Sequence, residues 1–293
     1  MPFQPDYPVS EDRRAYTLPG GPVGALMLHG FLGSPTSSRP LAEHLSRHGI
    51  AAHCPLLPGH GELPDKMYGL KRQQWLDEAE EGLEILRQYA DEIFIVAHSM
   101  GTVLGAHLAC HHADIRGMAM LAPLYKVPNR ALHLIRPLRY VMPWFYPWRL
   151  RPLRRLARER VLDLYPDLDL DDPEVLAWLP EATRIPSGAI EEMRKMAAFG
   201  RRLWPRLSVP AIILQGERDI AVRPGAARAV YERIASKDKT FHLFPQAGHE
   251  LMRPFEPVHA QVWSLILDFI RRHSRHPLPD AEGLPATAAG MPG

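Results

Sequence analysis

The sequence predicts an α/β protein with a mostly parallel central sheet, helices on both faces and an inserted helical cap. Short apolar runs bounded by turn residues recur along the chain, as expected for strands buried on both faces. Longer segments with helical periodicity separate these runs, and this alternation is typical of a parallel sheet. The alternation stops between Tyr125 and Leu207, where only helical pieces divided by prolines are found.

Six apolar runs are the predicted strands. They are Val23–Leu28, Ile50–Ala52, Ile93–Ala97, Met118–Leu121, Ala211–Leu214 and Phe241–Phe244. Between them, Arg72–Ala90 repeats apolar residues at spacings of three and four and carries acids on its other face, which predicts an amphipathic helix. The segment Val258–His273 follows the same pattern.

The stretch between the fourth and fifth runs is too long for a plain loop in a compact domain. We therefore predict a helical cap or lid at residues 125–206, with the α/β core formed by 1–124 and 207–272. The last residues, 273–293, are rich in Pro, Gly and Ala with almost no large apolar side chains. Such a composition predicts a disordered tail.

Composition narrows the possible functions. The 293 residues carry a net charge of only +2, so no overall charge demands a nucleic-acid partner. The N-terminal stretch lacks the apolar core of a secretory signal, and no run approaches the roughly 18 apolar residues of a membrane span. We expect a cytoplasmic protein of undetermined oligomeric state. Cys54 and Cys110 are predicted to be buried thiols, because each lies in or beside an apolar run and free cysteines are usually buried. Two cysteines make no disulfide framework.

The segment Ala97-His98-Ser99-Met100-Gly101 joins a predicted strand to a predicted helix. A serine nucleophile is exposed by a sharp turn of this kind, which needs small residues two positions before and after it. Ala97 stands where the common G-x-S-x-G pattern has its first glycine, but alanine meets the same steric requirement. We predict Ser99 as a nucleophile; the alternative is an ordinary serine that caps the next helix.

A serine nucleophile needs a base and a carboxylate that orients the base. Asp219 follows the fifth predicted strand and His249 follows the sixth. Because the carboxyl ends of parallel strands meet at one edge of a sheet, both residues are expected near Ser99. The order Ser, Asp, His agrees with a nucleophile on a strand-to-helix turn. Asp238 precedes the last strand and belongs to the opposite edge.

Two backbone N–H groups are the expected oxyanion donors. One belongs to Met100, directly after the nucleophile, and the other to Phe31 in the loop "LHGFLGS", whose ring would wall the acyl pocket. This chemistry needs no metal and no organic cofactor. His107 and His111 are four residues apart on a helix but lack an evident third metal ligand. His60 and His98 are interpreted as packing and loop residues.

These segments together resemble the α/β-hydrolase superfamily, and within it the bacterial carboxylesterase and monoacylglycerol lipase group. The motifs "LMLHGFLGSP", "LLPGHGELP", "IVAHSMGTVLG", "LQGERDIAV" and "FPQAGHELM" stand in the order of that group, from about Gly24 to Arg271. The insertion lies where the group carries its small cap. The sequence departs from the group at Ala97 and in the Arg- and Trp-rich insertion.

The resemblance implies a role for each site residue. Ser99 would be the nucleophile, His249 the base and Asp219 the residue that orients it, with Phe31 and Met100 as oxyanion donors. The implied activity is hydrolysis of a small-molecule or lipid-like carboxylic ester through an acyl-enzyme. A thioesterase or an acyltransferase would use the same triad, and a non-catalytic ligand-binding protein of this fold is a further alternative.

The cap divides its charge between two halves. Eight arginines, one lysine and no acid occur between Lys126 and Arg158, and eight acids occur between Glu159 and Glu181. The halves either pair or form solvated faces. The alternative is a basic surface carrying Trp144, Phe145 and Trp148 that contacts an anionic interface.

Overall fold

A computed structural model describes residues 1–126, 141–165 and 167–279. Its centre is a seven-stranded sheet in the order β1-β3-β2-β4-β5-β8-β9. The strands are β1 (Tyr16–Leu18), β2 (Val23–Leu28), β3 (Ile50–Cys54), β4 (Glu92–His98), β5 (Ile115–Leu121), β8 (Ala211–Gly216) and β9 (Lys239–Phe244). Only β1 runs antiparallel to its neighbour. The prediction of a mostly parallel sheet is confirmed, while the short edge strand β1 was not predicted.

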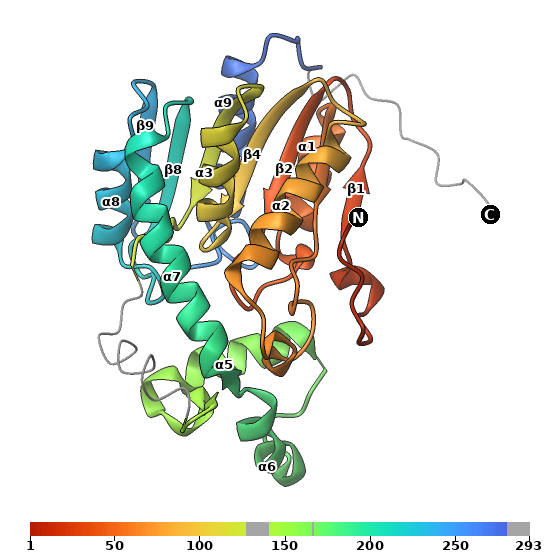
Figure 1. The fold of residues 1–293 in the computed structure, drawn as a ribbon, viewed down its shortest axis with the longest axis vertical. Helices are drawn as coiled ribbons and strands as arrows, with labels where there is room; N and C mark the ends of the chain where they lie inside the picture. Colours follow the sequence, from red (N-terminus) through yellow and green to blue (C-terminus); the bar gives the residue numbers. More distant parts are fainter. Residues whose placement is uncertain (127–140, 166, 280–293) are drawn as a thin grey trace, which may run out of the picture.

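Helices cover both faces of this sheet (Figure 1). One face packs against α2 (Arg72–Leu86), α3 (Gly101–His111), α7 (Ser187–Leu203) and α8 (Pro224–Arg233), and the other against α1 (Arg39–Arg47) and α9 (His259–His273). Side chains of β4 alternate between the two layers: Ile95 and Ala97 lie in the first, Phe94 and Val96 in the second. This alternation explains why the strand is apolar throughout, since both of its faces are buried.

The cap lies between β5 and β8 and extends below the sheet in Figure 1. It contains α5 (Arg151–Leu164) and α6 (Pro173–Ala182), so the predicted helical insertion is confirmed. Two strands of two residues each, β6 (Trp144–Phe145) and β7 (Ile185–Pro186), pair antiparallel here. No strand was predicted in this region, because strands of two residues do not form a recognisable apolar run.

Helix α7 begins in the cap and ends in the core. Its later residues Met196, Ala197 and Leu203 are buried among the same side chains that cover the sheet. A Cβ atom placed on Gly200 would come within 2.8 Å of Val103 in α3, so the two helices are in close contact. The cap boundary proposed at residue 206 therefore follows a helix that both regions share.

Helix α9 ends at His273, and the chain then continues along the core. The Ser274 hydroxyl donates a hydrogen bond of 2.7 Å to Glu92, and Leu278 packs against the α1/α9 layer. The rest of the predicted tail, residues 280–293, lies outside the described residues, and its disorder stays a prediction. Among the described helices, none combines the length and the apolar character needed to cross a bilayer.

Short 3-10 helices complete the described structure. They are η1 (Glu11–Arg13), η2 (Pro35–Ser37), η3 (Pro64–Met67), η5 (Pro147–Arg149) and η6 (Trp204–Arg206). Both cysteines are free thiols: Cys54 is buried as predicted, whereas Cys110 is half-buried.

Candidate active site

Ser99 occupies a strained turn between β4 and α3. Its φ of 52° lies in the left-handed region, which costs a non-glycine residue about 1–3 kcal/mol and persists only where the surroundings enforce it. The enforcement is visible in the backbone: the Ser99 N–H donates to Leu121 O at 2.9 Å, and Ser99 O accepts from the Thr102 N–H at 3.1 Å. The Ser99 side chain is half-buried rather than enclosed. The turn thus presents a hydroxyl at the carboxyl edge of the sheet.

Small residues make room for this turn on both sides. A Cβ on Gly101 would lie 2.2 Å from Leu28 O, so no side chain fits at that position. Ala97 is buried in the layer that faces α3. A Cβ on Gly105 in α3 would lie 3.5 Å from the Ala97 Cβ, an ordinary contact distance, and 2.7 Å from Ile95 and Met118. The Ala97 methyl therefore fits in this layer, and Gly105 is required by its contacts with Ile95 and Met118.

Asp219 and His249 are brought together at the same edge. The His249 Nδ1 lies 2.7 Å from Asp219 Oδ2, and the Asp219 side chain is fully buried. Burial alone would raise the pKa of this carboxyl. Interactions with His249 and Val222 outweigh this effect and hold the pKa of Asp219 below its usual value. They are the hydrogen bond and the electrostatic attraction to His249, and the hydrogen bond from the Val222 N–H. Asp219 is therefore an ionised acceptor.

The ionised carboxylate fixes the histidine tautomer. Because Asp219 can only accept, Nδ1 of His249 carries the proton and Nε2 is left with a lone pair. Ser99 and His249 make no hydrogen bond to each other in the described structure. Bonds of this kind are often long in unliganded enzymes and tighten when substrate binds.

The loop after β2 lies against Ser99. A Cβ on Gly30 would lie 3.0 Å from the Ser99 Cβ and 3.3 Å from His98 Nδ1, so glycine favours this close approach. The Gly33 N–H donates to Gly30 O at 3.0 Å, and Leu32 has a φ of 64°. The predicted donors, the N–H groups of Phe31 and Met100, bind no backbone carbonyl among the described residues.

The Phe31 ring does not take the position expected for it. It packs edge-on against Trp75 at 6.0 Å and against His60 at 6.1 Å between ring centroids. The neighbouring Leu32, turned the other way by its left-handed backbone, lines the pocket instead. Leu32, and not Phe31, is therefore among the residues that line this pocket.

Two residues that the sequence analysis missed hold the site in place. Gln215 is fully buried, and its amide donates to Asp219 Oδ2 at 3.2 Å and to Val222 O at 3.0 Å. The Thr102 hydroxyl donates to Ser99 O at 2.6 Å and accepts from the Leu124 N–H at 3.2 Å. A glutamine in an apolar strand and a threonine directly after the elbow were the available signals.

The Glu250 carboxylate is a second charged group near His249, after Asp219. His98 donates from Nε2 to His249 O at 3.0 Å, and burial lowers the pKa of His98 to about 4, so this side chain is neutral. The Glu250 carboxylate belongs to the same cluster, in which one donor atom each of His98, His249 and Glu250 lies within 4.8 Å of the others. Arg160 of α5 binds Glu250 at 2.8 Å. An ion pair and two hydrogen-bonded histidines thus account for this cluster without a metal ion.

The histidines interpreted as structural have structural contacts. His60 is buried, and its Nδ1 donates to Pro58 O at 3.0 Å. His111 Nδ1 donates to His107 O at 2.7 Å, and His107 lies 3.3 Å from Glu80. Asp238 lies at the start of β9 and binds His273 at 2.9 Å, away from the elbow.

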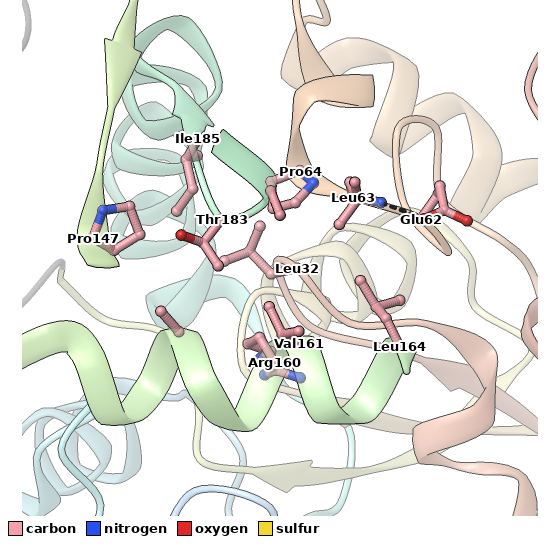
Figure 2. Close-up of a pocket in the computed structure, with 12 residues that line it drawn as sticks. Leu32, Glu62, Leu63, Pro64, Pro147, Arg160, Val161, Leu164, Thr183 and Ile185 are labelled. Carbon is pink, nitrogen blue, oxygen red and sulfur yellow. Dashed lines mark hydrogen bonds between the residues drawn. The ribbon is translucent and has the colours of Figure 1, made fainter. Parts of the chain in front are cut away.

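An apolar pocket lies between the cap and the loops of the core. Figure 2 shows Val161 and Leu164 of α5 on one side and Pro64 and Ile185 across from them, with Leu32 between. The pocket measures about 50 Å³, which leaves room for roughly three or four waters. Leu32 joins it to the loop beside Ser99, and Arg160 joins it to Glu250.

Neighbouring side chains partly cover the cap aromatics. Trp144, Phe145 and Trp148, which the alternative interpretation placed on a basic surface, are half-buried. Trp144 is stacked between Tyr68, at 5.4 Å, and the Arg184 guanidinium, at 4.2 Å. The exposed large apolar side chains on or beside the cap are Tyr68, Val141, Met142, Leu150, Leu176 and Trp178.

The charge halves of the cap pair in part. Arg149 and Arg184 both bind Glu181, at 3.8 and 2.8 Å. Arg151, Arg154 and Arg158 are exposed on α5. The section of the basic run between residues 127 and 140 lies outside the described residues.

Comparison with known proteins identifies the family. A family model described as serine aminopeptidase, S33, matches residues 24–257. The chain belongs to this family of α/β hydrolases. The S33 match begins in β2 and ends just before α9, so it contains the elbow, the cap, Asp219 and His249. The resemblance inferred from the sequence is confirmed.

Relatives and solved structures agree with the S33 assignment. A thermostable monoacylglycerol lipase from Bacillus sp. (strain H-257) is 30% identical over 268 residues, covering 92% of this chain and 98% of the lipase. A Bacillus subtilis (strain 168) carboxylesterase is 22% identical, covering 86% and 96%. Among structures, one of the metagenome-derived lipolytic enzymes LipS and LipT has a TM-score of 0.74 at 23% identity, covering 91% of this chain and all of its own, 100%. The α/β-hydrolase fold is thereby confirmed.

Proposed function

We propose that this ester hydrolase of the S33 family cleaves carboxylic esters through a Ser99–His249–Asp219 triad and an acyl-enzyme. The observation that carries the proposal is the strained Ser99 at the same sheet edge as the 2.7 Å Asp219–His249 pair. Strained non-glycine residues cluster at functional sites, and a turn of this kind exposes a serine nucleophile.

Each group has a defined part in the reaction. Ser99 Oγ attacks the ester carbonyl while His249 Nε2 takes the hydroxyl proton, and Asp219 stabilises the imidazolium that forms. The N–H groups of Phe31 and Met100 bind the tetrahedral oxyanion. The imidazolium then protonates the departing alcohol, and His249 activates a water that releases the acid from Ser99.

The pocket supports an acyl chain as the bound group. Its lining is mostly aliphatic, with Leu32, Val161, Leu164 and Ile185 among the lining side chains. The similarity to a monoacylglycerol lipase and a carboxylesterase supports a lipid-like or simple ester substrate. Because the pocket is small, a long acyl chain requires the cap to shift away from the core. The cytoplasmic location expected from the sequence stays a prediction.

Replacement of the nucleophile tests the proposal. Ser99→Ala is expected to lower kcat for p-nitrophenyl butyrate by about a thousandfold or more, and to abolish labelling by a fluorophosphonate probe. The matched control is Ser264→Ala on the exposed side of α9, where the hydroxyl only binds Ala260 O. Near-normal turnover by Ser99→Ala would refute the triad. Faster turnover of acyl thioesters than of matched esters would favour the thioesterase alternative.

We also propose that the cap contacts an anionic lipid surface. Exposed Leu150, Leu176 and Trp178 would enter the interface, and exposed Arg151 and Arg158 would bind its phosphates. The protein is expected to sediment with vesicles rich in phosphatidylglycerol and not with phosphatidylcholine vesicles. Arg151→Glu with Arg158→Glu should weaken this binding, and equal binding to both vesicle types would contradict the proposal.

A further inference from the structure

Arg160 and Glu250 connect the cap to the residue next to the proposed base. The Arg160 Nη2 donates to Glu250 Oε1 at 2.8 Å, and the two side chains are 20% and 17% exposed. Arg160 belongs to α5 of the cap, while Glu250 directly follows His249 in the loop after β9. The ion pair therefore crosses the boundary between cap and core at the site itself.

The charges around His249 are nearly balanced while this ion pair is formed. Asp219 faces His249 from the loop after β8, and neutral His98 faces it from the end of β4. Within its own segment, Arg253 acts on Glu250, and a Cβ on Gly248 would lie 3.1 Å from the Glu256 carboxylate. Burial would favour the neutral form of Glu250, but Arg160 and the other nearby positive groups hold its pKa well below the usual range.

Loss of the contact would change this balance in a definite direction. Glu250 would keep its negative charge a few ångströms from the His249 ring without the arginine that offsets it. An uncompensated carboxylate stabilises a nearby imidazolium. A protonated His249 cannot accept the proton of Ser99, so the base would be less available at a given pH.

We propose that the Arg160–Glu250 ion pair is a positioning element that couples the seating of the cap to the readiness of His249 to act as a base. The inference rests on the proposed triad function. With the cap seated, Arg160 offsets the charge of Glu250 at the site. With the cap displaced, Glu250 loses this arginine and keeps Arg253 of its own segment as a positive neighbour, so the carboxylate favours a protonated His249 more than before.

Opposite charge deletions provide the test. The measured quantity is the pH at the midpoint of the acidic limb of kcat/KM for p-nitrophenyl butyrate. Arg160→Met is expected to raise this midpoint by about half to one pH unit, because it exposes His249 to the charge of Glu250. Glu250→Gln is expected to lower it by a similar amount, about half a unit or more, because it removes a negative charge close to His249. The double variant should return close to the wild-type midpoint.

Control variants separate this role from general disruption of the fold. Arg160→Lys keeps the charge and should keep the wild-type midpoint. Arg154→Met removes an equal charge from an exposed position on the same helix and should also leave it unchanged. A purely structural ion pair would lower kcat/KM without moving the two midpoints in opposite directions.

The outcomes distinguish this inference from the function on which it rests. Midpoints that stay fixed or move in the same direction, in variants that remain active, would overturn the inference alone. A wild-type protein that fluorophosphonate does not label at Ser99 would overturn the triad itself. If Arg160→Met does not fold, the nearly isosteric Glu250→Gln still decides the matter through the sign of its shift.

Discussion

The sheet edge and the cap solve different physical problems with different side chains. At the edge, Ser99, Ala97 and Gly101 stand where strand, helix and loop nearly touch, and each position tolerates little change. In the cap, α5 and α6 pack through a smaller cluster of buried side chains than the core has. They expose charged and apolar side chains together. The comparison indicates that the proposed catalytic groups are held by close packing, whereas the cap leaves more room for substitution.

The largest expected effect comes from the edge. Asp219→Asn should lower kcat by about ten-thousandfold, because an amide permits the wrong histidine tautomer while preserving the shape of the side chain. The control is Asp238→Asn, whose parent carboxylate binds His273 far from the elbow. Steady-state kinetics on p-nitrophenyl butyrate compare the two, and similar losses in both variants would remove the special role of the edge.

The same substitution at two glycines compares packing in the two regions. Gly101→Ala should cost about 3 kcal/mol or more of the free energy of unfolding, since its methyl would overlap a backbone carbonyl. Gly188→Ala, on α7 within the cap, has nothing within 4 Å of the added Cβ and should stabilise by up to about 1 kcal/mol. Urea unfolding measures both, and equal effects would contradict the contrast.

Acid should weaken the core through its buried histidines. Burial lowers the pKa of His29 to about 3 and of His60 and His98 to about 4. Between pH 6.5 and these values the unfolded chain binds protons that the folded chain does not, so this stability is present above pH 6.5 and lost as the pH falls. From pH 7.5 to 5.5 the loss should be about 1 kcal/mol per histidine.

Urea unfolding at several pH values checks this dependence. Residues 141–206, which contain the described part of the cap, have no histidine, so the acid sensitivity should belong to the core. His60→Gln, if it folds, should show a shallower decline than the wild type. A free energy of unfolding that is constant between pH 7.5 and 5.5 would show that these histidines are not held neutral.

The smallest effect is expected in the cap pocket. Ala157→Phe places a ring among the pocket-lining side chains and should lower the ratio of kcat/KM for p-nitrophenyl decanoate to that for the acetate by about tenfold. Met142→Phe, at an exposed cap position, is the control and should leave the ratio unchanged. A change of equal size for both esters would mean that the pocket does not hold the acyl chain.

The two regions also differ in what the sequence could predict. Strand β2 occurs with the predicted bounds, Val23–Leu28, because its apolar run is continuous and ends at glycine-containing loops. Strands β6 and β7 were missed because two residues cannot establish a period. The fold of the core is encoded by local patterns, and these patterns can be detected from the sequence alone.

Predictability at the site followed the same division. Ser99, Asp219 and His249 could be proposed because each lies in the segment that follows a strand of the same parallel sheet. Gln215 and the Arg160–Glu250 pair could not, because their partners are fixed only by tertiary packing, and the latter two are 90 residues apart. The place of the Phe31 ring was not predicted, because it depends on the left-handed backbone at the neighbouring Leu32.

Helix α7 limits how the cap can move. Its 17 residues form a rod about 25 Å long, and one end is clamped against α3 while the other enters the cap (Figure 1). Because α7 is stiff and packed against α3 at one end, it restrains the cap and does not let it move freely. Opening should therefore be a small tilt concentrated in α5 and α6, with slow amide hydrogen exchange along α7 and faster exchange in those two helices. Product would leave through a gap that widens by flexing, and the whole cap would not swing free.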